Sequence, residues 1–243
     1  MKGMAVSGQA AVERGTGTQK RVLVTGFEAY GGRGLNPAAE IVRALDGRTL
    51  DGGLIIGRTL PVSYRELAPR LESLVRDIAP ALVICLGLWP GEQTIRLERF
   101  GLNLAHFEIP DNDGLRIEEE AIEAKGAVGR RASLPLRAIE AALLAEGIPA
   151  RMSSTAGTFL CNVTLYTLMR LLDAPAQPTL GGFIHVPYMP EQVAGMLADA
   201  KKDRRLELHQ RADFASMELS RMVHAVEIAI AVSLAASRAE PER

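Results

Sequence analysis

The sequence is short of cysteine, which excludes a disulfide scaffold. Only 2 cysteines, Cys85 and Cys161, occur among 243 residues. A chain of this length buries a sizeable core without covalent staples, so two isolated cysteines are typical of a protein from a reducing compartment. We therefore expect a cytoplasmic protein in which at least one thiol is free to react.

An excess of charge of one sign is also missing. The 28 Lys and Arg residues nearly balance the 29 Asp and Glu residues, and the formal net charge is -1. This balance lacks the basic footprint of proteins that bind nucleic acids or anionic membranes. The first twenty residues hold no apolar run of signal-peptide length, and no uncharged apolar stretch is long enough to span a bilayer. We expect a small molecule or a peptide as ligand, without nucleic acid or membrane.

Regular structure is predicted only between residues 21 and 237. Segments 1–20 and 238–243 are small, polar or charged, and we expect mobile ends there. Between them, short apolar runs alternate with stretches of helical periodicity. Strands are predicted at 21–26, 54–57, 81–87, 150–152 and 182–186, and helices at 36–45, 63–78, 135–146, 161–172, 190–201 and 216–236. The alternation predicts an α/β fold: a single three-layer domain with a mostly parallel central sheet and helices on both faces.

The run 81–87 contains no polar residue, which is typical of a central strand covered on both faces, and it assigns Cys85 to the core. The stretch 101–116 lacks helical periodicity and is rich in turn-forming residues, so it is predicted to leave the sheet.

Cys161 differs from Cys85, because it follows a small-residue loop at the start of a predicted helix. The positive end of a helix dipole favours a thiolate, and the free N–H groups there could hold an oxyanion. The alternative is that Cys161 is a small buried apolar residue.

A thiol nucleophile needs a base, and His185 is the best placed of the four histidines. It ends the apolar run 182–186 and precedes Pro187, so it lies at the carboxyl end of a buried strand, where open α/β sheets bind ligands. A core histidine with both nitrogens satisfied is the alternative. A carboxylate would orient its ring. Glu98 follows the central strand, but the residue pattern does not distinguish it from Glu92, Glu108 and Asp111.

Four segments together resemble the pyroglutamyl peptidase I family, over nearly the whole chain from Val22 to Val232. They are Val22-Leu-Val-Thr-Gly-Phe-Glu-Ala-Tyr-Gly-Gly with Asn36-Pro37, Leu97-Glu98-Arg99 with Ile109-Pro-Asp-Asn-Asp-Gly114, Ser154-Thr-Ala-Gly-Thr-Phe-Leu-Cys161-Asn162, and Gly182-Phe-Ile-His185-Val-Pro. The resemblance implies a catalytic triad of Cys161, His185 and Glu98. It also implies removal of N-terminal pyroglutamyl residues from peptides by a soluble homo-oligomer that needs no metal or cofactor.

By the same resemblance, the substrate-binding residues are Phe27, Tyr30 and Asn36. A pyroglutamyl ring is flat and uncharged, so its pocket should be apolar with a few hydrogen bonds to the lactam. The chain departs from the family where an arginine is usual, having Glu92 and Glu108 instead, and Trp89 is expected to pack within its loop.

These departures keep two alternatives open: a related cysteine amidase or peptidase with a different N-terminal acyl specificity, and a catalytically weak relative that binds peptides. The glycines of 26–34 fit neither the dinucleotide fingerprint nor a P-loop, which disfavours a nucleotide-binding module.

Overall fold

The computed structural model describes residues 19–32, 34–173, 179–202 and 214–239. Seven strands form the main sheet in the order β2-β3-β1-β4-β9-β5-β8, and β6 and β7 form a separate pair. The strands are β1 (Lys20–Phe27), β2 (Thr49–Leu50), β3 (Gly53–Leu60), β4 (Leu82–Leu88), β5 (Ile95–Glu98), β6 (Phe100–Leu102), β7 (Gly129–Arg131), β8 (Ala150–Ser153) and β9 (Leu180–Val186). The helices are α1 (Pro37–Leu45), α2 (Tyr64–Ile78), α3 (Leu136–Ala145), α4 (Leu160–Leu172), α5 (Pro190–Lys202) and α6 (Leu219–Ala239).

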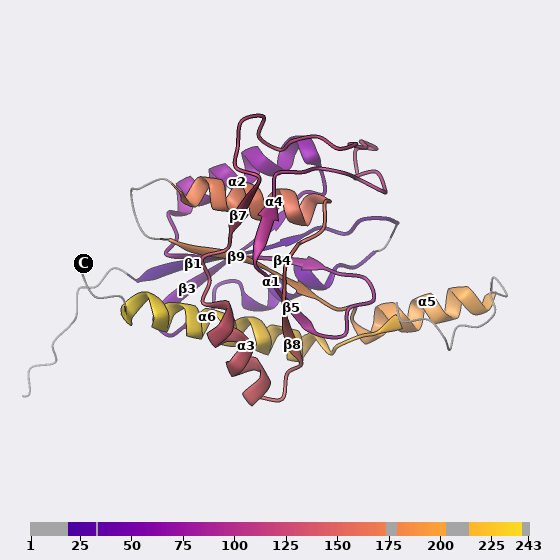
Figure 1. Ribbon diagram of the computed structural model, residues 1–243. Helices are drawn as coiled ribbons and strands as arrows, with labels where there is room; N and C mark the ends of the chain where they lie inside the picture. The colour runs from indigo at the N-terminus through magenta and orange to yellow at the C-terminus, as the bar shows by residue number, and fades with distance from the viewer. Residues whose placement is uncertain (1–18, 33, 174–178, 203–213, 240–243) are drawn as a thin grey trace, which may run out of the picture.

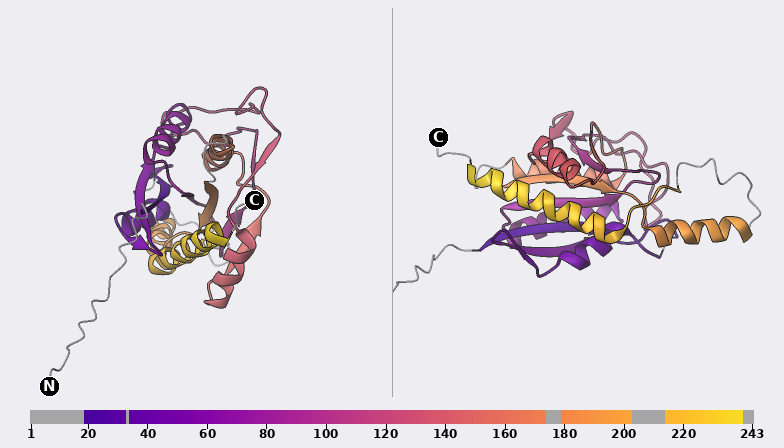
Figure 2. Two further views of the ribbon diagram at one scale, coloured as in Figure 1. Left: turned by 90° about the vertical axis from the view of Figure 1, so that its left-hand side faces the viewer. Right: turned by 90° about the horizontal axis from the view of Figure 1, so that it is seen from below.

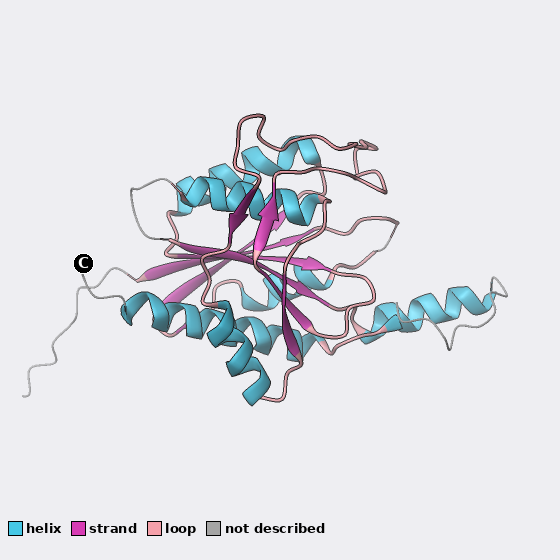
Figure 3. Ribbon diagram, in the orientation of Figure 1, coloured by secondary structure: helices cyan, strands magenta, loops and turns pink. Residues whose placement is uncertain are grey.

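The sheet lies between two layers of helices. In Figure 1, α2 and α4 cover the upper face, and α1, α3 and α6 cover the lower one; Figure 3 distinguishes the strands of the middle layer from the helices by colour. Strands β3, β1, β4 and β9 are parallel, whereas β5 runs antiparallel to β9 and parallel to β8. The predicted fold class, a three-layer α/β unit with a mostly parallel sheet, is confirmed.

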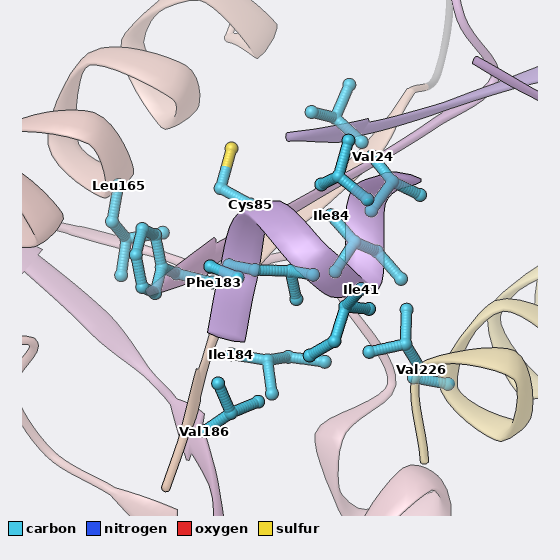
Figure 4. Packing of buried hydrophobic residues seen from close by; sticks show 14 of the residues in the cluster. Val24, Ile41, Ile84, Cys85, Leu165, Phe183, Ile184, Val186 and Val226 are labelled. Atoms are coloured by element: carbon cyan, nitrogen blue, oxygen red, sulfur yellow. The ribbon is translucent and has the colours of Figure 1, made fainter. Parts of the chain in front are cut away.

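Strand β4 is buried along its whole length, as its uninterrupted apolar sequence predicts. Because side chains alternate between the two faces of a strand, its residues pack against the helices on both faces of the sheet. Figure 4 shows Cys85 on the side of Leu165 from α4, and Ile84 on the opposite side, toward Ile41 of α1 and Val226 of α6. The prediction that Cys85 is a core residue is confirmed, and burial raises its pKa to about 12.

Two helices begin at residues that cap them. The Asn36 side chain accepts a hydrogen bond from the N–H of Ala38 at 3.1 Å, and Pro37 occupies the first turn of α1. The Ser63 hydroxyl accepts from the N–H of Glu66 at 3.3 Å and begins α2. These caps fix where the chain turns from the sheet into the helices, and the start of α1 lies beside the carboxyl end of β1.

The sequence-based prediction was wrong about the segment that carries Glu98. It placed this residue in a loop, whereas Glu98 ends strand β5, which is buried between β9 and β8. The short strands β2, β6 and β7 were also missed. The predicted mobile ends, 1–20 and 238–243, fall almost wholly outside the described residues.

Helix α6 is long and apolar enough, by length and composition alone, to cross a membrane. Its buried residues include Met222, Val226 and Ile230, which belong to the main hydrophobic core, so α6 has the character of a core helix. Helix α5 differs from the others, because it extends away from the sheet in both Figure 1 and the right-hand view of Figure 2.

Candidate active site

One cavity of about 350 Å³ opens where the carboxyl ends of the parallel strands meet. Both Cys161 and His185 line it. Its other lining residues are Tyr30, Leu88, Trp89, Pro90, His106, Glu108, Ile109, Ala156, Gly157, Thr158 and Phe159. The wall is mainly apolar and aromatic, and the two groups capable of nucleophilic and base chemistry face it together.

The sheet register brings His185 and Glu98 to the same face. Arg96 lies directly opposite His185 in the β5–β9 ladder, and Glu98 lies opposite Phe183. Side chains two residues apart share a face, so Glu98 reaches His185 diagonally across the ladder. The Nδ1 of His185 lies 2.8 Å from Oε1 of Glu98, and both side chains are fully buried.

This contact fixes the tautomer of the histidine. An ionised carboxylate only accepts hydrogen bonds, so the proton of a neutral His185 ring is on Nδ1. Its Nε2 is then the proton acceptor, and this atom is buried without a hydrogen-bond partner among the described residues. An imidazole oriented by a carboxylate, with its second nitrogen free, is arranged to act as a general base.

Arg96 supplies the charge that balances Glu98. Its Nε lies 2.6 Å from the same Oε1 that meets His185, and an Nη donates to the carbonyl of Thr155 at 2.6 Å. The guanidinium lies over the Trp89 ring, 3.7 Å from the ring centroid. The Trp89 ring in turn meets the His185 ring edge-on, with centroids 5.0 Å apart. Arg96 and Trp89 together hold the carboxylate and the imidazole from one side.

Cys161 is the second residue of α4, and a glycine makes room for it. A Cβ atom added at Gly87 of β4 would lie 2.9 Å from the Cys161 sulfur and 2.8 Å from the Phe183 ring. Real Cβ atoms do not approach other atoms so closely, so only glycine lets the start of α4 lie against the sheet here. The N–H groups of Leu160 and Cys161 begin the helix and have no intrahelical carbonyl to bond, which leaves them free for an oxyanion.

The expectation of a lowered thiol pKa was wrong. Burial, together with the negative charge of Glu98, raises the pKa of Cys161 to about 12, while its own backbone N–H acts in the opposite direction. Burial likewise lowers the pKa of His185 below its ordinary 6.5, against the opposing effect of Glu98. Both shifts favour a resting pair of neutral thiol and neutral imidazole, in which the thiolate forms as the sulfur attacks.

The three residues expected to bind the substrate lie around a small recess beside Cys161. Phe27, Tyr30 and Asn36 line this recess of about 20 Å³, and Tyr30 also lines the larger cavity. The Asn36 amide is already engaged, because its oxygen caps α1 and its nitrogen donates to the carbonyl of Glu28 at 2.9 Å.

Sequence reasoning missed three residues of the site. Trp89 was expected to pack within its loop, but it contacts Arg96 and His185 and lines the cavity. His106 lines the cavity as well, and Arg96 is the third residue that was missed. The alternation Ile95-Arg-Leu-Glu98 could have indicated that Arg96 and Glu98 share a face. Of the carboxylates weighed against Glu98, Glu92 is buried beside Arg151 and Arg96, and Glu108 is exposed on the cavity wall.

The last alternative, Asp111, has a structural role. Its carboxylate accepts hydrogen bonds from the N–H groups of Asp113 and Leu115, at 3.0 and 2.8 Å, and so shapes the loop.

Within the described ranges, no group of three or more His, Cys, Asp or Glu side chains is placed to hold a metal ion.

A thiol, an oriented imidazole and a buried carboxylate at the carboxyl edge of an α/β sheet define the class of thiol-dependent hydrolases. Residues 20–236 match the family model described as pyroglutamyl peptidase. The chain belongs to the pyroglutamyl peptidase family, cysteine peptidases that remove N-terminal pyroglutamate.

Named relatives agree with this family. The pyrrolidone-carboxylate peptidase of Thermococcus litoralis is 37% identical over 215 residues, which cover 88% of this chain and 93% of that protein. That of Cupriavidus pinatubonensis is 37% identical over 217 residues, 89% of this chain and 94% of that protein. The solved structure of the pyrrolidone carboxyl peptidase from T. litoralis has a TM-score of 0.83 at 36% identity, covering 92% of this chain and 97% of that one.

Proposed function

We propose that Cys161, His185 and Glu98 are the catalytic triad with which this chain removes N-terminal pyroglutamyl residues from peptides. The observation that carries the proposal is the 2.8 Å contact between Glu98 and Nδ1 of His185. This contact leaves Nε2 of His185 without a partner among the described residues, and Cys161 lines the same cavity as His185. The nucleophile, the base and the orienting acid each come from a different element: α4, β9 and β5.

The neutral resting pair dictates how the first step proceeds. As the Cys161 sulfur attacks the carbonyl carbon that joins pyroglutamate to the next residue, Nε2 of His185 takes the thiol proton. The carbonyl oxygen becomes an oxyanion, which the free N–H groups at the start of α4 can stabilise. The imidazolium is stabilised by Glu98, whose carboxylate also accepts a hydrogen bond from Nε of Arg96 at 2.6 Å.

The intermediate then collapses. The carbon–nitrogen bond breaks, Nε2 returns its proton to the leaving amine, and the pyroglutamyl group remains on Cys161 as a thioester. A water molecule, deprotonated by Nε2, attacks the thioester carbon; the carbon–sulfur bond breaks, pyroglutamate leaves and the thiol regains its proton. Every proton transfer uses the same nitrogen, so the reaction needs no further acid or base.

The walls beside Cys161 suit an uncharged ring. Phe27 is almost fully buried, and the Tyr30 and Phe159 rings lie 6.3 Å apart, centroid to centroid. An apolar, aromatic recess favours a flat lactam over an N-terminal residue with a charged ammonium group, because none of the described residues that line the small recess has a carboxylate to pair with that charge. We assign ring recognition to Phe27 and Tyr30, and we assign to Asn36 the positioning of the loop that carries Tyr30.

The test is release of a fluorophore from pyroglutamyl and prolyl amides in reducing buffer. We expect the wild type to cleave the pyroglutamyl amide only, Cys161→Ala to lose on the order of 10⁴-fold or more in rate, and Cys85→Ala to retain activity. Cleavage of a different N-acyl amide instead would show that the triad serves another acyl specificity. Equal loss in both cysteine variants would contradict the assignment of the nucleophile.

We also propose that the protein is a cytoplasmic homo-oligomer. A nucleophilic thiol must stay reduced, which supports a reducing compartment. Helix α5 extends from the body of the subunit (Figure 1) and offers a surface to a second copy. Light scattering should give a mass of at least two chains, and cell fractionation should recover the protein with the cytoplasm; a single-chain mass or a membrane fraction would contradict these proposals.

A further inference from the structure

A second cavity, of about 380 Å³, lies on the other face of the sheet from Glu98. It is lined by Arg99, Arg131, Ala132, Leu134, Pro135, Leu136, Arg137, Ala138 and Met152, and it shares no residue with the cavity of Cys161. Arg99 follows Glu98 directly along the chain. Because successive side chains alternate between faces, Glu98 faces α4 whereas Arg99 faces α3.

Three arginines line this second cavity, and none of them forms an ion pair with a described residue. The contrast with neighbouring arginines is clear, since Arg130 contacts Glu123 and Asp173, and Arg96 contacts Glu98. The Nε of Arg99 is buried and has no hydrogen-bond partner in the described part of the chain. A buried donor without an acceptor costs about 1–3 kcal/mol, so an acceptor that bonded this Nε would stabilise the protein.

The start of α3 adds further donors to the same cavity. Pro135 precedes the helix without a side-chain cap, and the first turn contains no acidic residue. The N–H groups of Arg137 and Ala138 therefore have no intrahelical carbonyl to bond. The nearest acidic residue along α3 is Glu140, whose carboxylate accepts the N–H of Met152, a residue of this cavity, at 3.0 Å. The start of α3 and three arginines thus line the same cavity.

We infer that this cavity binds a small anion bearing a phosphate group. Planar guanidinium groups donate paired hydrogen bonds that match phosphate oxygens, and free N–H groups at a helix start favour the same ligand. Leu134, Leu136 and Met152 provide apolar walls for the organic part of a phosphate ester, and the volume admits a molecule larger than phosphate alone. The site is independent of the proposed peptidase activity, because it uses none of the residues of that cavity.

Thermal unfolding and calorimetry test the inference, with inorganic phosphate and ribose 5-phosphate as probes and sodium chloride at equal ionic strength as the reference. At about 100 times the dissociation constant, a bound ligand should raise Tm by several degrees. Tighter binding of ribose 5-phosphate than of phosphate would identify an ester as the ligand, and equal binding would identify free phosphate.

The double variant Arg131→Gln/Arg137→Gln removes two guanidinium groups from the cavity rim, and both side chains are exposed, so folding should persist. We expect at least tenfold weaker binding in this variant and in Arg99→Gln. Arg70→Gln, an exposed arginine on α2, is the matched control and should bind as the wild type does. Unchanged binding in the double variant, or a Tm rise no larger than that with sodium chloride, would overturn the inference.

Discussion

Replacing Arg96 with glutamine should destabilise the fold and change the pH dependence of catalysis together. Arg96 is buried, with 7% of its surface exposed, and its Nε lies 2.6 Å from Oε1 of the fully buried Glu98. Removing the cation leaves a buried carboxylate whose charge is no longer balanced, which costs about 3–5 kcal/mol. For a chain of this size, each kcal/mol corresponds to about 2–4 °C in Tm, so Tm should fall by roughly 6–20 °C.

The effect on His185 has a definite sign. The positive charge of Arg96 disfavours the imidazolium and lowers the pKa of His185. Without that charge the pKa rises, so the acid limb of the kcat/KM profile should move to higher pH in Arg96→Gln. Arg96→Lys keeps a positive charge but loses the planar group that lies over Trp89. The acid limb of this variant should therefore lie between those of the wild type and Arg96→Gln.

Urea unfolding and a pH series of kcat/KM give the two readouts. The control is Arg58→Gln, because the Arg58–Asp46 pair, 3.6 Å apart, has side chains that are 42% and 51% exposed. An exposed pair contributes about 0–1 kcal/mol, so this variant should unfold almost as the wild type does. If Arg96→Gln unfolds like Arg58→Gln, Arg96 does not balance the charge of Glu98; if its acid limb does not move upward, Arg96 does not lower the pKa of His185.

Further predictions follow from the same geometry. Gly87→Ala places a Cβ 2.9 Å from the Cys161 sulfur, so stability should fall by about 1–3 kcal/mol in urea unfolding and kcat should fall with it; normal values of both would contradict the close approach. Asn162→Ala removes a buried amide that bonds the backbone of Leu102 and Leu104 at 2.7–2.9 Å, which should cost about 2–4 kcal/mol, and a loss below about 1 kcal/mol would show that the loop relaxes. With the pKa of Cys161 raised to about 12, alkylation by iodoacetamide should quicken about tenfold per pH unit from about pH 7 to 9, and a plateau near neutrality would show a preformed thiolate. Because the pKa of folded His185 lies below 6.5, the unfolded chain binds more protons just under that pH, so this residue's contribution to stability should decline as pH falls below 6.5 and stay level above it. The acid limb of kcat/KM reports the folded imidazole and should lie below pH 6.5 as well; an acid limb above pH 6.5 would contradict the lowered pKa.

The elements that the sequence predicted well are those with a strong local pattern. The run around Cys85 contains only apolar residues, and it forms β4, the buried central strand. Helix α2 begins at Ser63 because a serine followed three residues later by glutamate caps a helix start. His185 was located by its place at the end of an apolar run, a signal that is local as well.

The parts that were missed depend on contacts between distant segments. Strand β5 is only four residues long and carries Arg96 and Glu98, two charged side chains that are seldom buried. They are buried because Arg96 pairs with Glu98, and Glu98 pairs with His185, 87 positions away. The thiol pKa was mispredicted for the same reason: the helix start is visible in the sequence, but the partial desolvation of the Cys161 thiol and its nearness to Glu98 are not.

The most direct test of the triad is to locate the residue that a pyroglutamyl reagent alkylates. The purified protein would be treated with pyroglutamyl chloromethyl ketone, whose chloride a thiolate displaces, and then digested and mapped by mass spectrometry. We predict one modified peptide, bearing the label on Cys161, and no labelling after His185→Ala or with the corresponding prolyl reagent. A label on Cys85, or equal labelling in the His185 variant, would contradict a triad of Cys161, His185 and Glu98.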